Sequence, residues 1–212
     1  MLFMLLLLCG CALGSGDFTA KTKDLASKTM VVKGGEAEPI SGSAFAFEVN
    51  GDTYIATARH VAIGIMYTSG LEIQFCSSLD PKSCVFQITT MGFTYTSDLP
   101  TLDTIVWKVE EVPSGVKVSK TNCNPRVGEK VFAGGAPFGR APDISQGYVT
   151  WKSMGLIIHD ARTAPGSSGG PLFNRRGQVV GQSIAVETIG SANVSSSSVA
   201  LDICTVIDLA YR

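Results

Sequence analysis

Histidine is scarce in this chain, and neither sign of charge dominates it. The 212 residues include 2 histidines, and 17 basic side chains stand against 18 acidic ones. Because nucleic-acid binding needs a basic surface, the balanced charge argues against that class of partner. The sequence also lacks a Cys-x-x-Cys pair with a histidine nearby, which argues against a tetrahedral zinc site. We therefore expect no nucleic-acid partner, no metal and no cofactor.

Long hydrophobic runs are absent too, apart from residues 1–8. This run is too short to cross a bilayer, but it matches the apolar region of a signal peptide. Two processing routes remain open over residues 1–14: lipidation of Cys11, within a Leu-Cys-Gly-Cys that resembles a lipoprotein box, or ordinary signal cleavage. A third interpretation is a piece of a viral polyprotein that kept part of a membrane segment. The first two routes predict export to a periplasmic, secreted or membrane-anchored location, with attachment through Cys11 or the apolar segment.

What the chain has in quantity is glycine, 23 residues of it, set among short β-branched runs. This composition favours strands over helices, and the length suits one domain built of β-barrels. The polar residues 15–27 are expected to form a tether, and 202–212 a short helix. Strands are expected within 28–49 and over 53–57, 71–76, 83–90, 104–109, 129–133, 145–153, 155–159, 171–174, 177–186 and 198–203, with a hairpin turn at Asn50-Gly51.

The strongest chemical signal is the segment 164–172, Ala-Pro-Gly-Ser-Ser-Gly-Gly-Pro-Leu. Its glycines allow close approach of the backbone and let two N–H groups point at one oxygen. A serine hydroxyl becomes a nucleophile when a histidine takes its proton and a carboxylate orients that histidine. His60 follows the strand expected over 53–57 and precedes an expected glycine-containing loop, and Asp103 directly precedes another expected strand. Their order along the chain, with the serine last, is that of one known type of catalytic triad.

Several segments together resemble the chymotrypsin-like serine peptidases, and most closely the HtrA branch. The likeness covers about residues 28–207 and implies an all-β fold of two six-stranded antiparallel barrels, about 28–111 and 126–207, with the active site in the cleft between them. HtrA enzymes generally carry a PDZ module beyond this domain, and we expect none here. The matching segments are 42–45, 57–61, 127–128 with 134–139, 145–149 and 164–181.

The resemblance implies a serine endopeptidase. Ser168 would attack the scissile carbonyl and form an acyl-enzyme, His60 would transfer the proton, and Asp103 would fix the histidine tautomer. Ser167 is the competing nucleophile, but Gly-x-Ser-Gly-Gly favours Ser168. Asp98 competes with Asp103, which directly precedes an apolar strand as the family pattern requires.

The N–H groups of Gly166 and Ser168 are expected to form the oxyanion hole. The other histidine, His159, has no motif role, so a structural or surface position is expected for it.

Two further segments are expected to hold the substrate side chain on the amino side of the scissile bond. The segment expected to form the floor of this substrate pocket carries no aspartate, which argues against cleavage after Lys or Arg. Arg162 would favour an acidic side chain if it pointed inward, although glutamate-specific relatives usually present a histidine where Ser183 stands. The default expectation is a small or medium apolar side chain. The floor residues are Arg162, Thr163 and Ala164, and those of the opposite wall are Ser183, Ile184 and Ala185.

Apart from the two N-terminal cysteines, the chain has an even set of four. An even set suits an oxidising compartment. A local bridge between Cys76 and Cys84 is expected, since they flank a turn-rich segment. Cys123 and Cys204 would then join the inter-barrel connection to the C-terminal segment. Four free thiols are the alternative.

Three other functions remain as alternatives: a protease-fold binding module without turnover, an esterase-type acyl hydrolase, and a viral serine protease that processes a polyprotein. Esterases usually present Gly-x-Ser-x-Gly between a strand and a helix, whereas a strand is expected after this serine. Protein or peptide substrates are the expected partners, and the sequence leaves the oligomeric state open.

Overall fold

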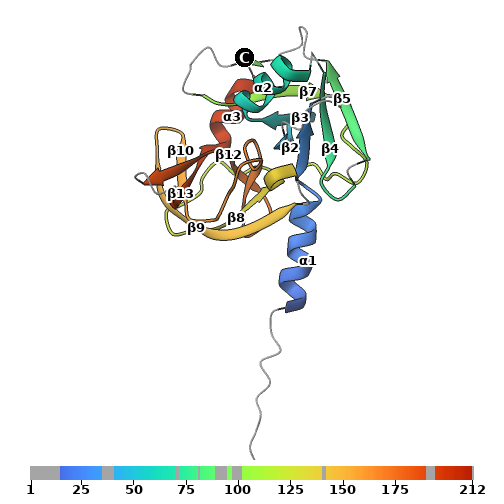
Figure 1. Cartoon of the computed structure of the whole chain (residues 1–212). Coiled ribbons are helices and arrows are strands. Elements are labelled where there is room, and N and C mark those ends of the chain that lie inside the picture. Colours follow the sequence, from blue (N-terminus) through green and yellow to red (C-terminus); the bar gives the residue numbers. More distant parts are fainter. Residues whose placement is uncertain are drawn as a thin grey trace, which may run out of the picture.

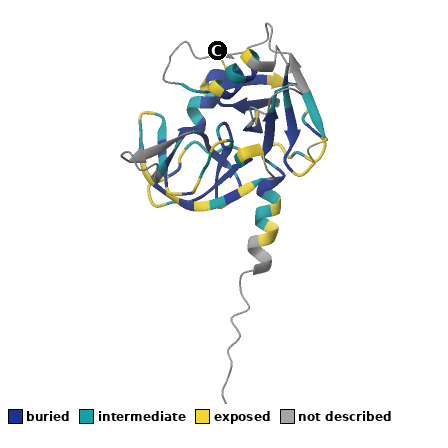
Figure 2. Cartoon of the chain, in the orientation of Figure 1, coloured by how far each residue is buried: buried dark blue, intermediate teal, exposed yellow. Residues whose placement is uncertain are grey.

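The structure is a computed structural model that describes residues 15–34, 41–69, 72–80, 82–88, 95–96, 102–139, 142–189 and 194–211. Two β-structures lie against each other, and helix α1 projects below them (Figure 1). Buried residues gather along the inner faces of both (Figure 2). The processing expected within residues 1–14 lies outside the described residues.

The N-terminal half is a seven-stranded sheet in the order β5-β4-β1-β2-β3-β7-β6. The chain makes a tight turn between β2 and β3, where Asn50 and Gly51 have φ of 53° and 86°. This is the hairpin that an Asn-Gly pair predicts. The strands are β1 (Met30–Lys33), β2 (Ser41–Val49), β3 (Asp52–Thr57), β4 (Glu72–Ser77), β5 (Cys84–Ile88), β6 (Tyr95–Thr96) and β7 (Ile105–Val109).

The C-terminal half is a closed barrel in the order β10-β13-β12-β11-β8-β9. The all-β, chymotrypsin-like fold is therefore confirmed. The expected six-stranded N-terminal barrel takes the form of a curled sheet, because its edge strands β5 and β6 do not pair with each other in the described part of the chain. The barrel strands are β8 (Lys130–Gly135), β9 (Asp143–Ser153), β10 (Leu156–His159), β11 (Pro171–Asn174), β12 (Val179–Ile189) and β13 (Val194–Asp202).

In the described ranges three α-helices accompany the strands, and two of them differ from the sequence expectations. Residues expected as a tether form α1 (Ser15–Ala26), whose last turn is held by burial of Leu25. Helix α2 (Arg59–Ser69) begins where a loop was expected, because Val61 and Ile65 on one face are buried in the core.

The expected C-terminal helix is present as α3 (Ile203–Ala210), with the Asp202 side chain accepting a hydrogen bond from the Cys204 N–H at 3.0 Å. A short 3₁₀ turn, η1 (Pro137–Gly139), follows β8. No helix in the described part of the chain is both long enough and apolar enough to cross a membrane.

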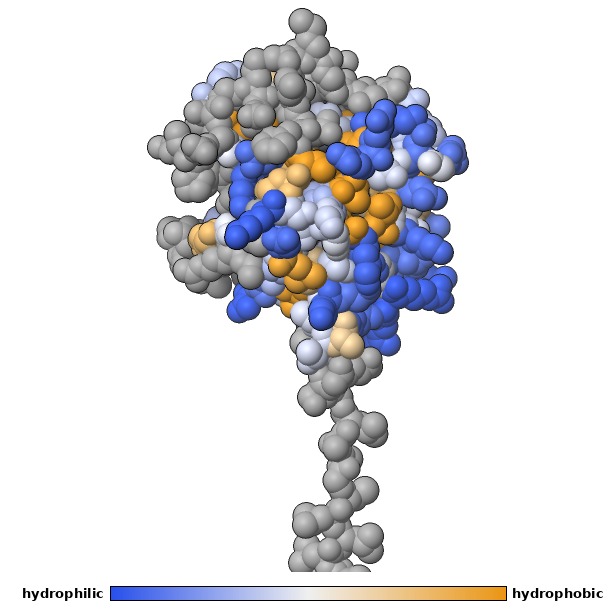
Figure 3. All heavy atoms as spheres, turned by 90° about the vertical axis from the view of Figure 1, so that its right-hand side faces the viewer, coloured by the Kyte–Doolittle hydropathy of each residue, from blue (hydrophilic) through white to orange (hydrophobic). Residues whose placement is uncertain are grey.

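Both expected disulfides are present. Cys76 pairs with Cys84 across β4 and β5. Cys123 pairs with Cys204, which ties the connection between the two halves to the start of α3. Figure 3 views the molecule from the side of the N-terminal sheet and shows separate apolar patches among hydrophilic residues.

Candidate active site

The pairing of β3 with β7 brings His60 and Asp103 together. Thr57 lies opposite Ile105 in this pair of strands, so the segments that follow β3 and precede β7 meet at one edge. The Asp103 carboxylate contacts His60 twice: Oδ1 accepts the backbone N–H at 2.8 Å, and Oδ2 lies 2.5 Å from Nδ1. Because Nδ1 carries the hydrogen in this contact, Nε2 is left free to accept a proton.

The carboxyl group of Asp103 has a pKa below its usual value. Its partial burial acts to raise the pKa, but the hydrogen bonds from the side chain and backbone of His60 outweigh that effect. The charge of Arg59 lowers the pKa further. Asp103 is therefore an anion at neutral pH and holds the imidazole in one orientation.

The two serines of the glycine-rich loop differ in exposure. Ser167 is buried, and its Oγ accepts the Ala164 N–H at 3.3 Å. A Cβ on Gly135 would lie 2.7 Å from the same Oγ, so the Ser167 side chain fills the space beside that glycine. Ser168 is partly exposed. Of the two, Ser168 is the one whose side chain is accessible to a substrate.

Ser43 of β2 links this loop to the histidine segment. Its N–H donates to the Ser168 carbonyl at 2.8 Å, and its Oγ donates to the Gly166 carbonyl at 2.7 Å. The Ala136 N–H donates to the same Oγ at 2.9 Å, and Thr57 Oγ1 donates to the Ser43 carbonyl at 2.7 Å. The sequence analysis did not identify Ser43 as a site residue, although the segment 42–45 was part of the resemblance.

Glycine is required where the loop meets the first sheet. Gly169 has φ of +86°, and a Cβ there would lie 2.2 Å from the Ser43 carbonyl and 2.6 Å from the Ala58 N–H. A side chain at this position would push the serine loop away from the segment that leads into His60.

Two backbone N–H groups of the loop differ from their neighbours in hydrogen bonding. Gly166 has φ of +97°. The N–H groups of Ser167 and Gly169 donate to backbone carbonyls at 2.8 and 2.7 Å. Those of Gly166 and Ser168 form no hydrogen bond with any described residue. These are the two groups expected to form the oxyanion hole.

The imidazole and the serine are not hydrogen-bonded in this structure. The Ser168 hydroxyl has no hydrogen-bond partner among the described residues. Such contacts are often long in enzymes without substrate and tighten when substrate binds. The structure thus brings His60 and Asp103 together directly, whereas Ser43 bonds both to the serine loop and to Thr57, three residues before His60.

The residues expected around the substrate side chain occupy different environments. Arg162 is on the surface, with 82% of its side chain exposed and its Nη2 3.9 Å from Asp143 Oδ2. Thr163 Oγ1 lies 2.8 Å from Ser198 Oγ. Ser183 is buried, and Ile184 is partly buried.

Two sequence candidates cannot be placed fully. The side chain of Ala185 lies outside the part of the chain whose side chains are described, and so does the whole of Asp98.

His159 lies in β10 and is fully buried, so a structural position replaces the surface alternative. Neither ring nitrogen has a hydrogen-bond partner among the described residues. Burial lowers the pKa of this imidazole to about 4, and the Ala161 backbone and the Asp160 charge act weakly in the opposite direction. His159 is therefore neutral at physiological pH.

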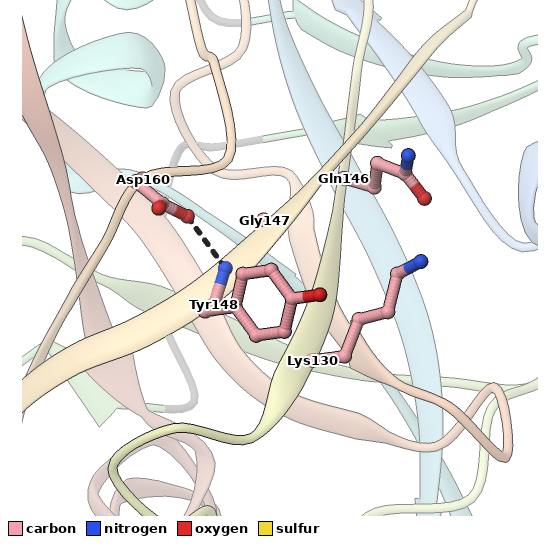
Figure 4. A pocket seen from close by; sticks show the side chains of 5 residues that line it. All are labelled: Lys130, Gln146, Gly147, Tyr148 and Asp160. Carbon is pink, nitrogen blue, oxygen red and sulfur yellow. Dashed lines mark hydrogen bonds between the residues drawn. The ribbon is translucent and has the colours of Figure 1, made fainter.

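A pocket of about 200 Å³ on the barrel lies beside the segment that follows β10, and is lined by Lys130, Gln146, Gly147, Tyr148 and Asp160 (Figure 4). Asp160 accepts the Tyr148 N–H there at 2.5 Å, and Gly147 leaves room for this close approach. The pocket contains no member of the predicted site. No group of three or more potential metal-binding side chains occurs among the described residues.

Comparisons with known sequences identify similar proteins. Residues 42–181 match the family model of the trypsin-like peptidase domain. A probable periplasmic serine endoprotease DegP-like of Pseudomonas fulva is 30% identical over 190 residues, which cover 80% of this chain and 36% of that protein. The DegP-like protein of Pseudomonas putida strain F1 is 38% identical over 181 residues, which cover 78% of this chain and 34% of that protein. The chain thus spans about a third of the length of these relatives.

Solved structures share the fold. The serine endoprotease from Yersinia pestis superimposes with a TM-score of 0.69 at 19% identity, covering 88% of this chain and 64% of that one. The HtrA-type protease AlgW with tripeptide gives a TM-score of 0.68 at 19% identity, and the match covers 88% of this chain and 61% of that one.

Proposed function

Because the chain belongs to the trypsin-like peptidase family, we propose that it is a serine endopeptidase acting through a triad of His60, Asp103 and Ser168. The observation that carries this proposal is the double contact of Asp103 with His60, at 2.8 and 2.5 Å, beside a glycine-framed, accessible serine. A binding module without turnover would not need an imidazole held in the tautomer of a general base.

The proposed reaction gives each of these groups a step. Nε2 of His60 takes the Ser168 proton as Oγ attacks the scissile carbonyl, and then gives that proton to the leaving amine. The resulting acyl-enzyme is hydrolysed by a water that the same imidazole activates. Asp103 stabilises the imidazolium that forms in each step, and its lowered pKa keeps it anionic while it does so.

The oxyanion hole is assigned to the N–H groups of Gly166 and Ser168, which have no protein acceptor among the described residues. In comparable enzymes, each such donor contributes roughly 3–4 kcal/mol to the stability of the transition state. The hydrogen bonds of Ser43 to the carbonyls of Gly166 and Ser168 hold the loop in this orientation.

Protein or peptide substrates in an exported location fit this function. The solved AlgW structures include complexes with a tripeptide and a decapeptide, and the DegP-like relatives carry the description periplasmic. Two disulfides suit an oxidising compartment. Attachment to a membrane through Cys11 stays a prediction.

Labelling with a fluorophosphonate, followed by mass mapping of the adduct, tests the proposal. We expect an adduct on Ser168 of the disulfide-intact protein, its loss in Ser168→Ala, and slow labelling in His60→Ala. Ser167→Ala is the matched control, in which the adduct should still map to Ser168. A folded protein that does not label would contradict the proposal and favour the binding module.

A further inference from the structure

Two hydrogen-bonded hydroxyl groups lie at the segment 162–164, which is expected to form the floor of the substrate pocket. Ser198 Oγ donates to the Ala161 carbonyl at 3.0 Å and lies 2.8 Å from Thr163 Oγ1. A serine hydroxyl has one hydrogen, and here the Ala161 carbonyl takes it. Thr163 must therefore donate its own hydrogen to Ser198. As a result, the Thr163 oxygen can only accept a hydrogen bond from a further group.

Ser183 adds a second, unpaired hydroxyl to this region. Its Oγ is buried and has no hydrogen-bond partner among the described residues. Ser183 lies opposite Ala200 in the pairing of β12 with β13, and Ala200 is two residues from Ser198, so the side chains of Ser183 and Ser198 share one face. The backbone of Ser183 bonds to Gly169 and Gly170, at 2.7 and 2.8 Å, directly after the nucleophile.

His159 lies on the other side of Ser198, opposite it in the pairing of β10 with β13. Its buried ring is neutral, because its pKa is about 4. The guanidinium of Arg162 turns to Asp143 on the surface. The residues of this cluster that the structure describes (His159, Thr163, Ser183 and Ser198) thus carry no charge at neutral pH, and they include both a hydroxyl donor and a hydroxyl acceptor.

We propose that this hydroxyl cluster selects an uncharged side chain with both a donor and an acceptor, glutamine first, on the amino side of the scissile bond. The inference rests on the proposed peptidase function and names its substrate class. The glutamine carbonyl oxygen accepts from the Ser183 hydroxyl, and its NH₂ group donates to Thr163 Oγ1.

The same hydroxyl groups disfavour an acidic or an apolar substrate side chain at this position. A glutamate side chain would meet the lone pairs of Thr163 and find no cation in the cluster to balance its charge. A methionine or leucine side chain would leave the buried Ser183 hydroxyl without a partner. Sites built to hydrogen-bond a substrate discriminate strongly against analogues that lack the group. We expect kcat/KM for the glutamine peptide to exceed that for the methionine peptide by about tenfold or more. It should exceed that for the glutamate peptide by at least the same factor.

The test uses the full chain with its disulfides intact and a series of peptides that differ only in this residue: glutamine, glutamate, methionine and leucine. The quantity compared is the ratio of kcat/KM for glutamine to that for methionine. Ser183→Ala and Thr163→Val remove one hydroxyl each with little change in size, and each should bring the ratio close to one. Thr150→Val is the control, because Thr150 bonds to the Ile158 carbonyl on the exposed side of the same barrel; it should keep the wild-type ratio.

Fluorophosphonate labelling of each variant shows whether its nucleophile is intact, so the two proposals fail in different ways. A wild-type protein that labels at Ser168 but prefers methionine, leucine or glutamate refutes the inference and leaves the peptidase function standing. A ratio that survives both Ser183→Ala and Thr163→Val refutes it as well. A folded wild-type protein that neither labels nor cleaves any peptide refutes both proposals.

Discussion

Acidification is expected to destabilise this protein through His159. The ring is fully buried, and its pKa is about 4 in the folded protein against 6.5 in a free side chain. Above pH 6.5 the imidazole is neutral in both states. As the pH falls below 6.5, the unfolded chain binds a proton that the folded protein does not, so the free energy of unfolding decreases until about pH 4. Each unit of difference between the two pKa values corresponds to about 1.4 kcal/mol. The free energy of unfolding therefore falls by about 3 kcal/mol in total.

Urea denaturation at pH 7.5 and 5.0 measures this effect. Over that interval the wild-type protein should lose about 2 kcal/mol more than His159→Phe or His159→Gln, which cannot titrate. Comparing the loss in the wild type with the loss in each variant removes the contributions of His60 and the carboxylates, which all three proteins share. Equal losses in the wild type and both variants would show that the His159 imidazole is not held neutral by burial, and would refute the reasoning.

Three further predictions concern the site and its frame. Asp103→Asn should lower kcat by about 10⁴-fold in a peptidase assay, since an amide cannot hold the histidine in the required tautomer; a loss below tenfold would contradict the triad. Gly169→Ala should lower the melting temperature by several degrees, because its Cβ would lie 2.2 Å from a carbonyl oxygen. Removing the Cys123–Cys204 bridge, which spans 81 positions, should cost about 4 kcal/mol of unfolding free energy, more than loss of the other bridge, which spans 8. These costs are compared by chemical denaturation of two double variants, in which both cysteines of one bridge are replaced by serine.

Local chemistry explains what the sequence predicts well. The Asn50-Gly51 turn depends on φ angles that these two residues adopt readily. The Cys76–Cys84 bridge depends on a short turn-rich segment that brings two neighbouring strands together. The serine motif is recognisable because nearly every residue in it has a local reason to be glycine or serine.

Contacts between distant segments explain what the sequence does not predict. Helix α2 forms because Val61 and Ile65 are buried in a cluster with residues of strands β1 to β4 and β7, which lie on both sides of the helix in the sequence. Ser43 acts on a carbonyl 123 positions away. The contact between Thr163 and Ser198 spans 35 positions and depends on the register of β13, which the hydrophobic pattern of that serine-rich strand does not specify.

The bonds of Ser43 also join the two halves of the molecule thermodynamically. The hydroxyl, the N–H and the carbonyl of this one residue connect the end of β3, the end of β8 and the serine loop. A chain in which only one half has folded cannot form this connection, because its donors and acceptors come from both halves. The arrangement of the loop around Ser168 therefore requires both halves of the molecule. Under the proposed function, hydrolysis would begin only once the two halves are docked.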